Sequence, residues 1–169
     1  QIKELDIEER YDWTKKISSI THAHVRSVMA CFYYLEFAKK IIEGKDKFQA
    51  YNELQSELTQ YFEQRKINPI EIHKFHRLLN EDISKVEEDN IKSSGYVIDT
   101  LEAAIWCILT TNNYKDAVLK AVNLGHDTDT TGAVTGGLAA LIYGMDNIPK
   151  EWINTLARKD DIINLTLNL

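Results

Sequence analysis

The stretch NLGHDTDTTGAVTGG (residues 123–137) joins two aspartates to four glycines, and small residues continue at helical spacing after it. A glycine inside a helix costs up to about 1 kcal/mol relative to alanine, so a helix this rich in glycine needs a compensating contact. The usual compensation is the close approach of another helix. We therefore predict a tightly packed helix that begins near Asp129 and runs to Tyr143, with Gly144 as its stop and Pro149 starting the next element.

The rest of the chain also predicts helices, because apolar residues recur at spacings of three and four. It contains only two prolines and seven glycines. The acidic segment NEDISKVEEDNIKSSG (residues 80–95) lacks this period and predicts a loop or a frayed helix. We expect an all-α fold, a compact multi-helix bundle. Two predicted stripes are Val25, Val28, Met29, Phe32 and Leu35, then Val97, Leu101, Ala104, Ile105 and Ile108, and two further helices cover Phe48 to Gln64 and Tyr114 to Val122.

Composition narrows the function classes. A chain of 169 residues is long enough for one domain that buries about 70% of its unfolded surface. No apolar run reaches the roughly 20 residues of a membrane span, and no signal-like segment opens the chain, so we expect a cytoplasmic protein. The net charge of −6 without a Lys/Arg cluster argues against nucleic acid as a partner. Cys31 and Cys107 are each isolated in sequence, and we expect both to be buried.

Asp127 and Asp129 lie two residues apart, so on one helix they would point roughly 200° from each other. They converge if Asp127 lies in the loop and Asp129 caps the helix. Two carboxylates about 4 Å apart repel by roughly 4 kcal/mol at an effective dielectric of 20, and a hard divalent cation such as Mg²⁺ would relieve this. The alternative is a simple cap beside a solvated aspartate. A calcium loop is excluded, because its twelfth position is Leu138 instead of a glutamate.

Three segments together resemble the ADP-ribosylglycohydrolase family. The strongest is AVNLGHDTDTTGAVTGGLAALIYGMDNIPKEW (residues 121–152), similar to the family's G-G-D-T-D-T, small-residue helix, Y-G and I-P-x-x-W pattern. SSGYVIDTLEAAIWCILTTNNY (residues 93–114) resembles its substrate-loop segment, and SSITHAHVRSVMACFYYLEFAKKI (residues 18–41) resembles its T-H segment. The resemblance covers most of residues 13–156. It implies an all-helical enzyme that hydrolyses the bond between ADP-ribose and a modified target, using two Mg²⁺ ions.

By this resemblance, Asp127, Asp129 and Thr130 are metal ligands. Ribose hydroxyls would replace metal-bound water, and the metals would orient the sugar as its anomeric carbon gains oxocarbenium character. The implied substrate-binding residues come from both loops and from the T-H segment. They are Ser93, Ser94, Gly95, Tyr96, His22 and His126.

Several of these residues also have a purely structural reading. The segment 93–96 would receive a pyrophosphate through free N–H groups and hydroxyls, or would serve as an ordinary helix cap. Tyr96 would contact substrate or belong to the core, and Asp99 would support the site or be a plain first-turn acid. His22 would face the ligand or bond to backbone. His126 replaces the second glycine of the family pattern, a departure that adds a side chain beside the metal loop.

The family's T-D-D motif, which carries its other metal ligands, and the acidic residue at its reaction centre lie in a preceding half that this chain does not match. We therefore expect residues 1–169 to be the C-terminal portion of a single domain that supplies half of a two-metal site, with the catalytic residue elsewhere. Completion by the missing segment and self-association are both open. An inactive ADP-ribose-binding or structural, crystallin-like homologue is the alternative to an enzyme.

Overall fold

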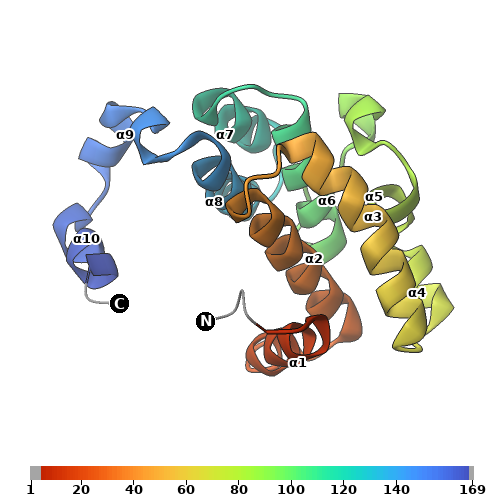
Figure 1. The fold of residues 1–169 in the computed structure, drawn as a ribbon. Coiled ribbons are helices and arrows are strands. Elements are labelled where there is room, and N and C mark those ends of the chain that lie inside the picture. The colour runs from red at the N-terminus through yellow and green to blue at the C-terminus, as the bar shows by residue number, and fades with distance from the viewer. Residues whose placement is uncertain (1–4, 168–169) are drawn as a thin grey trace.

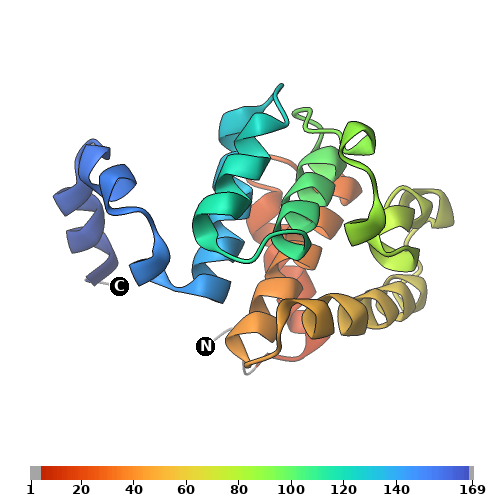
Figure 2. The ribbon, with the colours of Figure 1, turned by 90° about the horizontal axis from the view of Figure 1, so that it is seen from above.

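The structure, a computed structural model, describes residues 5–167, and every regular element in that range is a helix or a 3₁₀ turn. Figure 1 shows a helical body from which α9 and α10 stand apart, and Figure 2 shows the same separation from above. The all-α prediction is confirmed. The bounds are α1 (Ile7–Ser18), α2 (Val25–Ile42), α3 (Lys47–Gln64), α4 (Pro69–His73), α5 (His76–Asn80), η2 (Ile83–Lys85), η3 (Glu88–Asn90), α6 (Val97–Leu109), α7 (Tyr114–Asn123), α8 (Thr128–Tyr143), η4 (Met145–Asn147), α9 (Lys150–Thr155) and α10 (Lys159–Leu167).

Helix α6 forms the centre of the core. Every residue from 100 to 109 is buried, and α6 contacts α2, α3, α7 and α8. Its polar side chains have partners, as buried groups must: the Trp106 indole N–H donates to the Val86 carbonyl over 2.9 Å, and Arg77 donates to Glu102 over 3.0 Å. Burial raises the pKa of Glu102, and the nearby Arg77 guanidinium opposes that shift.

The small residues of α8 let its neighbours approach closely, as the sequence predicts. A Cβ at Gly132 would lie 3.0 Å from a methyl group of Val122, and one at Gly136 would lie 3.3 Å from the Tyr114 hydroxyl, both on α7. On another side, a Cβ at Gly137 would lie 2.5 Å from the hydroxyl of Tyr34 on α2. Side chains at these positions would force α8 away from α7 and α2.

The predicted helix bounds hold within one or two residues for α3, α7 and α8. The acidic segment is a loop carrying η2 and η3, as predicted. Helix α1 did not emerge from the apolar pattern, although its signal was available: Asp6 and Glu9 form a capping box at its start. Helix α4, which begins at Pro69 after the Asn68 cap, was also missed.

Two expectations about burial are wrong. Cys31 is exposed, whereas Cys107 is buried as predicted, and Leu35 is 47% exposed although it belongs to a predicted apolar stripe. Both residues lie on a side of α2 that no described helix covers. Among the described residues, no helix is both long and apolar enough to cross a bilayer.

Candidate functional site

The D-T-D-T segment forms the start of α8. Asp127 is the N-cap residue, two residues before the predicted cap, and α8 begins at Thr128 with Asp129 inside its first turn. The Asp127 carbonyl accepts two hydrogen bonds from Thr131, from its N–H over 3.1 Å and from its hydroxyl over 2.8 Å. Backbone and a threonine hydroxyl therefore fix the helix start, and the prediction that Asp129 is the cap is wrong.

Neither aspartate uses its carboxylate to cap the helix. Asp127 makes no side-chain cap bond, and within residues 5–167 no donor reaches the carboxylate oxygens of Asp127 or Asp129. Asp127 is half-buried, whereas Asp129 and Thr130 are exposed. The capping alternative thus does not account for the pair. Both carboxylates lie at the positive end of the α8 dipole, which stabilises negative charge there.

The turn before α8 explains the residue types at 125 and 126. Gly125 has φ +80° and His126 has φ +56°, so two consecutive residues occupy the left-handed region. Glycine adopts this region freely, and histidine is among the side chains that tolerate it better than most. His126 is exposed on this turn. The turn redirects the chain from α7 so that Asp127 faces the loop before α6.

The segment 93–96 packs directly against this turn. The Ser93 hydroxyl donates to the Gly125 carbonyl over 2.9 Å and approaches the Leu124 carbonyl at 3.3 Å, while the Asp127 N–H donates to the Ser93 carbonyl over 3.0 Å. Ser93 is 1% exposed. In this structure Ser93 therefore ties the two loops together, and its predicted contact with substrate stays a prediction.

Gly95 places backbone against the Asp127 carboxylate. A Cβ at Gly95 would lie 3.0 Å from the Asp127 Oδ2, closer than ordinary van der Waals contact. Beside it, the Ser94 hydroxyl donates to Asp99 over 2.6 Å and accepts the Tyr96 N–H over 3.1 Å. Ser94 thus bonds the N–H of Tyr96, the N-cap residue of α6, and α6 itself has no side-chain cap. Two sequence-predicted segments about 30 residues apart meet here.

Arg26 was not found from the sequence, although it lies beside a predicted site residue. Its guanidinium binds Glu71 of α4 with two hydrogen bonds, Nε to Oε2 over 2.5 Å and Nη2 to Oε1 over 2.9 Å. The bonds to Glu71 raise the pKa of Arg26, and the nearby Tyr96 contributes as well. The reciprocal bond from Arg26 lowers the pKa of Glu71. No sequence spacing signals this cluster, because its members lie on α2, on α4 and at the start of α6.

The T-H segment lies in the exposed turn before α2. The His22 Nδ1 lies 3.0 Å from the Thr21 hydroxyl, and among the described residues no hydrogen bond joins His22 to the two loops. His24 is the N-cap of α2 and accepts the Arg26 N–H. The predicted role of His22 toward a ligand stays a prediction.

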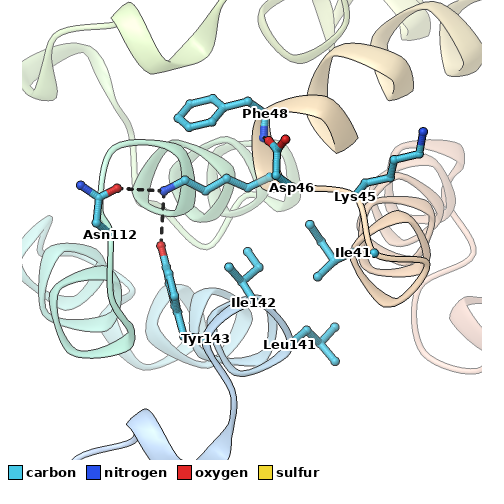
Figure 3. A pocket seen from close by; sticks show the side chains of 10 residues that line it. Ile41, Lys45, Asp46, Phe48, Asn112, Leu141, Ile142 and Tyr143 are labelled. Carbon is cyan, nitrogen blue, oxygen red and sulfur yellow. Dashed lines mark hydrogen bonds between the residues drawn. The ribbon is translucent and has the colours of Figure 1, made fainter.

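A pocket of about 630 Å³ lies at the opposite end of α8 (Figure 3). Lys47 lines this pocket, and its ammonium donates to the Asn112 side-chain oxygen over 3.4 Å and to the Tyr143 hydroxyl over 3.3 Å. The Lys47 ammonium lies 3.0 Å from the Ile108 carbonyl and also contacts the Thr111 carbonyl, so it caps the C-terminal end of α6. Burial lowers the pKa of Lys47. This pocket contains none of the predicted site residues.

Comparison with known proteins places these features in a family. The ADP-ribosylglycohydrolase family model matches residues 3–169. The chain belongs to the ADP-ribosylglycohydrolase family. Its matched segment is 51% identical over 83 residues to the ADP-ribosylarginine hydrolase Tri1 of Serratia proteamaculans (strain 568), covering 49% of this chain and 23% of that protein.

Two further comparisons agree. The ADP-ribosyl-[dinitrogen reductase] glycohydrolase of Rhodospirillum rubrum is 40% identical over 68 residues, covering 40% of this chain and 23% of that protein. A solved chain titled ADP-ribosylglycohydrolase-related protein complex superposes with a TM-score of 0.75 at 24% identity, over 94% of this chain and 52% of that one. The matched segment thus spans about a quarter of these curated ADP-ribosylglycohydrolase relatives, and the fold spans about half of the solved chain.

The predicted metal ligands do not form a complete metal site within the described part of the chain. No cluster of three or more His, Cys, Asp or Glu side chains in that part could hold a metal ion. Two free carboxylates and the exposed hydroxyl of Thr130 are nevertheless the hard oxygen donors that Mg²⁺ prefers. The ADP-ribosylglycohydrolase chain therefore presents a donor set that fits magnesium but needs further oxygens.

Proposed function

We propose that this chain supplies part of the active site of a Mg²⁺-dependent hydrolase that removes ADP-ribose from a modified protein side chain. The observation that carries the proposal is the unbonded Asp127 carboxylate held at the start of α8 against Gly95. Within residues 5–167 no hydrogen bond uses this carboxylate. The unbonded carboxylate supports a role in binding a cation beside the loop at Gly95, which has no side chain.

In the proposed site, Asp127, Asp129 and Thr130 hold magnesium. The bound metal supplies charge that orients ribose hydroxyls and stabilises the developing oxocarbenium character. The chain's own residues shape the surroundings: Gly95 leaves room for a ligand oxygen beside the Asp127 carboxylate, and Tyr96, 40% exposed, offers an aromatic ring at the edge. The general acid or base comes from outside these residues.

The names of the relatives guide the choice of substrate. Two of them are named ADP-ribosylarginine hydrolases, at 51% and 46% identity over about half of this chain. We therefore propose ADP-ribosylarginine as the linkage to test first, with ADP-ribosylated dinitrogen reductase, named for the Rhodospirillum relative, as the second. Both candidate substrates carry the same ADP-ribose group. They differ in the protein that surrounds the modified side chain.

The experiment is a calorimetric titration of the chain with ADP-ribose, first with Mg²⁺ and then with excess chelator. Metal-dependent heat that Asp127→Ala abolishes supports the proposal. The matched control is Asp146→Ala, since Asp146 is an exposed aspartate in η4. Heat that survives Asp127→Ala, or that disappears equally in the control, contradicts the assignment.

Turnover is tested separately, on residues 1–169 combined with the portion of the Serratia relative that they do not match. Release of ADP-ribose from ADP-ribosylarginine under these conditions supports an enzyme. Metal-dependent binding without release instead indicates a binding homologue, and indifference to metal and ligand alike indicates a structural one.

A further inference from the structure

One face of α8 is exposed although it is almost free of charge. Thr130, Ala133, Gly137 and Leu141 are all exposed, and their spacing of three and four places them on one side of the helix. Leu141 is 44% exposed. The glycines that pack against α7 lie on a different side, so this stripe is not part of the α7 contact. The Tyr34 side chain of α2 already reaches this stripe at Gly137, where a Cβ would lie 2.5 Å from the Tyr34 hydroxyl, so the open part of the stripe is Thr130, Ala133 and Leu141.

A second apolar stripe runs along the neighbouring helix α2. Cys31, Leu35 and Ile42 share one side of it, and Leu35 and Ile42 are 47% and 48% exposed. The two helices lie side by side, because the Tyr34 hydroxyl of α2 donates to the Val134 carbonyl of α8 over 3.2 Å (Figure 1). We call the two stripes together the α2–α8 face.

Exposed apolar surface of this kind marks an interaction site when it is contiguous. The comparison with the solved family member indicates which kind of partner fits this surface. Its fold continues well beyond the part that this chain superposes on, since the match covers 94% of this chain but only 52% of that one. A domain of twice this size needs a surface on which its two halves pack, and that surface is apolar in each half taken alone.

We propose that the α2–α8 face is the docking surface for a helical segment equivalent to the remaining half of an ADP-ribosylglycohydrolase domain. This inference rests on the proposed function. The small side chain of Ala133 leaves room for a docked segment, and the larger Leu35, Ile42 and Leu141 supply apolar area for it to bury. Because Thr130 begins the α8 stripe, the docked segment arrives beside the candidate metal ligands. Docking would thereby complete their coordination.

Cys31 provides a reporter within the α2–α8 face. It is exposed, whereas Cys107 is fully buried, so we expect the reagent to label Cys31 alone in the native fold. The experiment mixes the whole chain with the portion of the Serratia ADP-ribosylarginine hydrolase that has no counterpart in this chain, expressed as a separate polypeptide. At a partner concentration about ten times the Kd, labelling of Cys31 by a maleimide falls about tenfold, since only the free fraction reacts.

Two variants test the face itself. Leu35→Asp and Ile42→Asp each raise the Kd for the partner by at least about tenfold, because each would bury a charge among apolar groups. The control is Ile70→Asp, where Ile70 is 67% exposed and lies on α4, which contributes no residue to the α2–α8 face. It leaves the Kd unchanged. Circular dichroism of each free variant confirms that it is folded, so a lost interaction is not mistaken for lost structure.

The outcomes separate the two proposals. Full labelling of Cys31 at saturating partner overturns the docking surface, even if ADP-ribose still binds. Protection that appears with rising concentration of this chain alone, with a dimer in sedimentation, also overturns it and assigns the face to a second copy. Protection by the partner in a complex that releases no ADP-ribose keeps the docking surface and rejects the proposed activity.

Discussion

Replacing Ser93 with alanine tests whether this residue ties the two loops of the candidate site. Its hydroxyl donates to the Gly125 carbonyl over 2.9 Å, with Leu124 at 3.3 Å, and the side chain is almost fully buried. The substitution removes one hydrogen bond, worth about 1 kcal/mol, and leaves a carbonyl partly unsatisfied, at a cost of about 1–3 kcal/mol where water cannot reach it. Both carbonyls belong to half-buried residues, so we expect a total loss of about 1–2 kcal/mol.

For a chain of this length, each kcal/mol lowers the melting temperature by about 2–4 °C, so Ser93→Ala should melt roughly 2–8 °C below wild type. Circular dichroism through the thermal transition measures it. Ser19→Ala is the control, because Ser19 is an exposed residue at the end of α1.

An unchanged melting temperature for Ser93→Ala would refute the structural role of the hydroxyl. If ADP-ribose binding by the same variant were lost while its stability stayed at the wild-type level, Ser93 would instead contact the ligand directly. The two readouts therefore distinguish the tie between loops from the substrate contact that the sequence predicts.

Three further predictions follow from contacts in the same region and in the core. Gly95→Ala displaces the Asp127 carboxylate by about 0.4 Å, which exceeds the roughly 0.2 Å tolerance of a metal site. We therefore expect the Mg²⁺ Kd, measured by calorimetry, to rise tenfold or more, with little change in melting temperature. The Arg26 bonds hold the pKa of Glu71 below its ordinary value of 4.5, so their stabilisation is present above that pH and is lost as the pH falls through the folded-state pKa. Urea midpoints measured over this falling pH range should therefore decrease less in Glu71→Gln than in wild type. Parallel curves for the two proteins would show that the Arg26–Glu71 ion pair does not stabilise the fold. Burial raises the pKa of Cys107 to about 12, so a thiol reagent should modify Cys31 at once and Cys107 only at the rate of unfolding, and two fast thiols would contradict the assigned burial.

The sequence predicts features of this fold that arise from local rules. The run from residue 128 to Gly144 has glycines at helical spacing and a terminal glycine, and the structure ends α8 at that position with φ +83°. The two loops of the candidate site are likewise found from motif residues, because each motif carries its own glycine or serine. Their mutual contact is not local, and only the resemblance to a family suggested that they meet.

The sequence does not predict features that depend on what lies across the fold. Which aspartate caps α8 is decided by the left-handed turn at 125–126, and a histidine in that conformation is not a usual turn signal. The exposure of Cys31 depends on which faces of α2 other helices cover. The Arg26–Glu71 pair joins residues 45 positions apart. Each of these needs the tertiary arrangement before it has a meaning.

Helix α8 is fastened to α6 at both of its ends. At the start, the Asp127 N–H bonds the Ser93 carbonyl just before α6, and at the end, the Tyr143 hydroxyl donates to the Thr111 carbonyl just after α6, over 2.8 Å. The 16 residues between them span about 24 Å. These two hydrogen bonds join the ends of α8 to the residues that flank α6, so α8 cannot slide along α6 without breaking at least one of them. A displacement of α8 along its axis therefore changes both the surroundings of the two aspartates and those of Lys47, which contacts the Tyr143 hydroxyl.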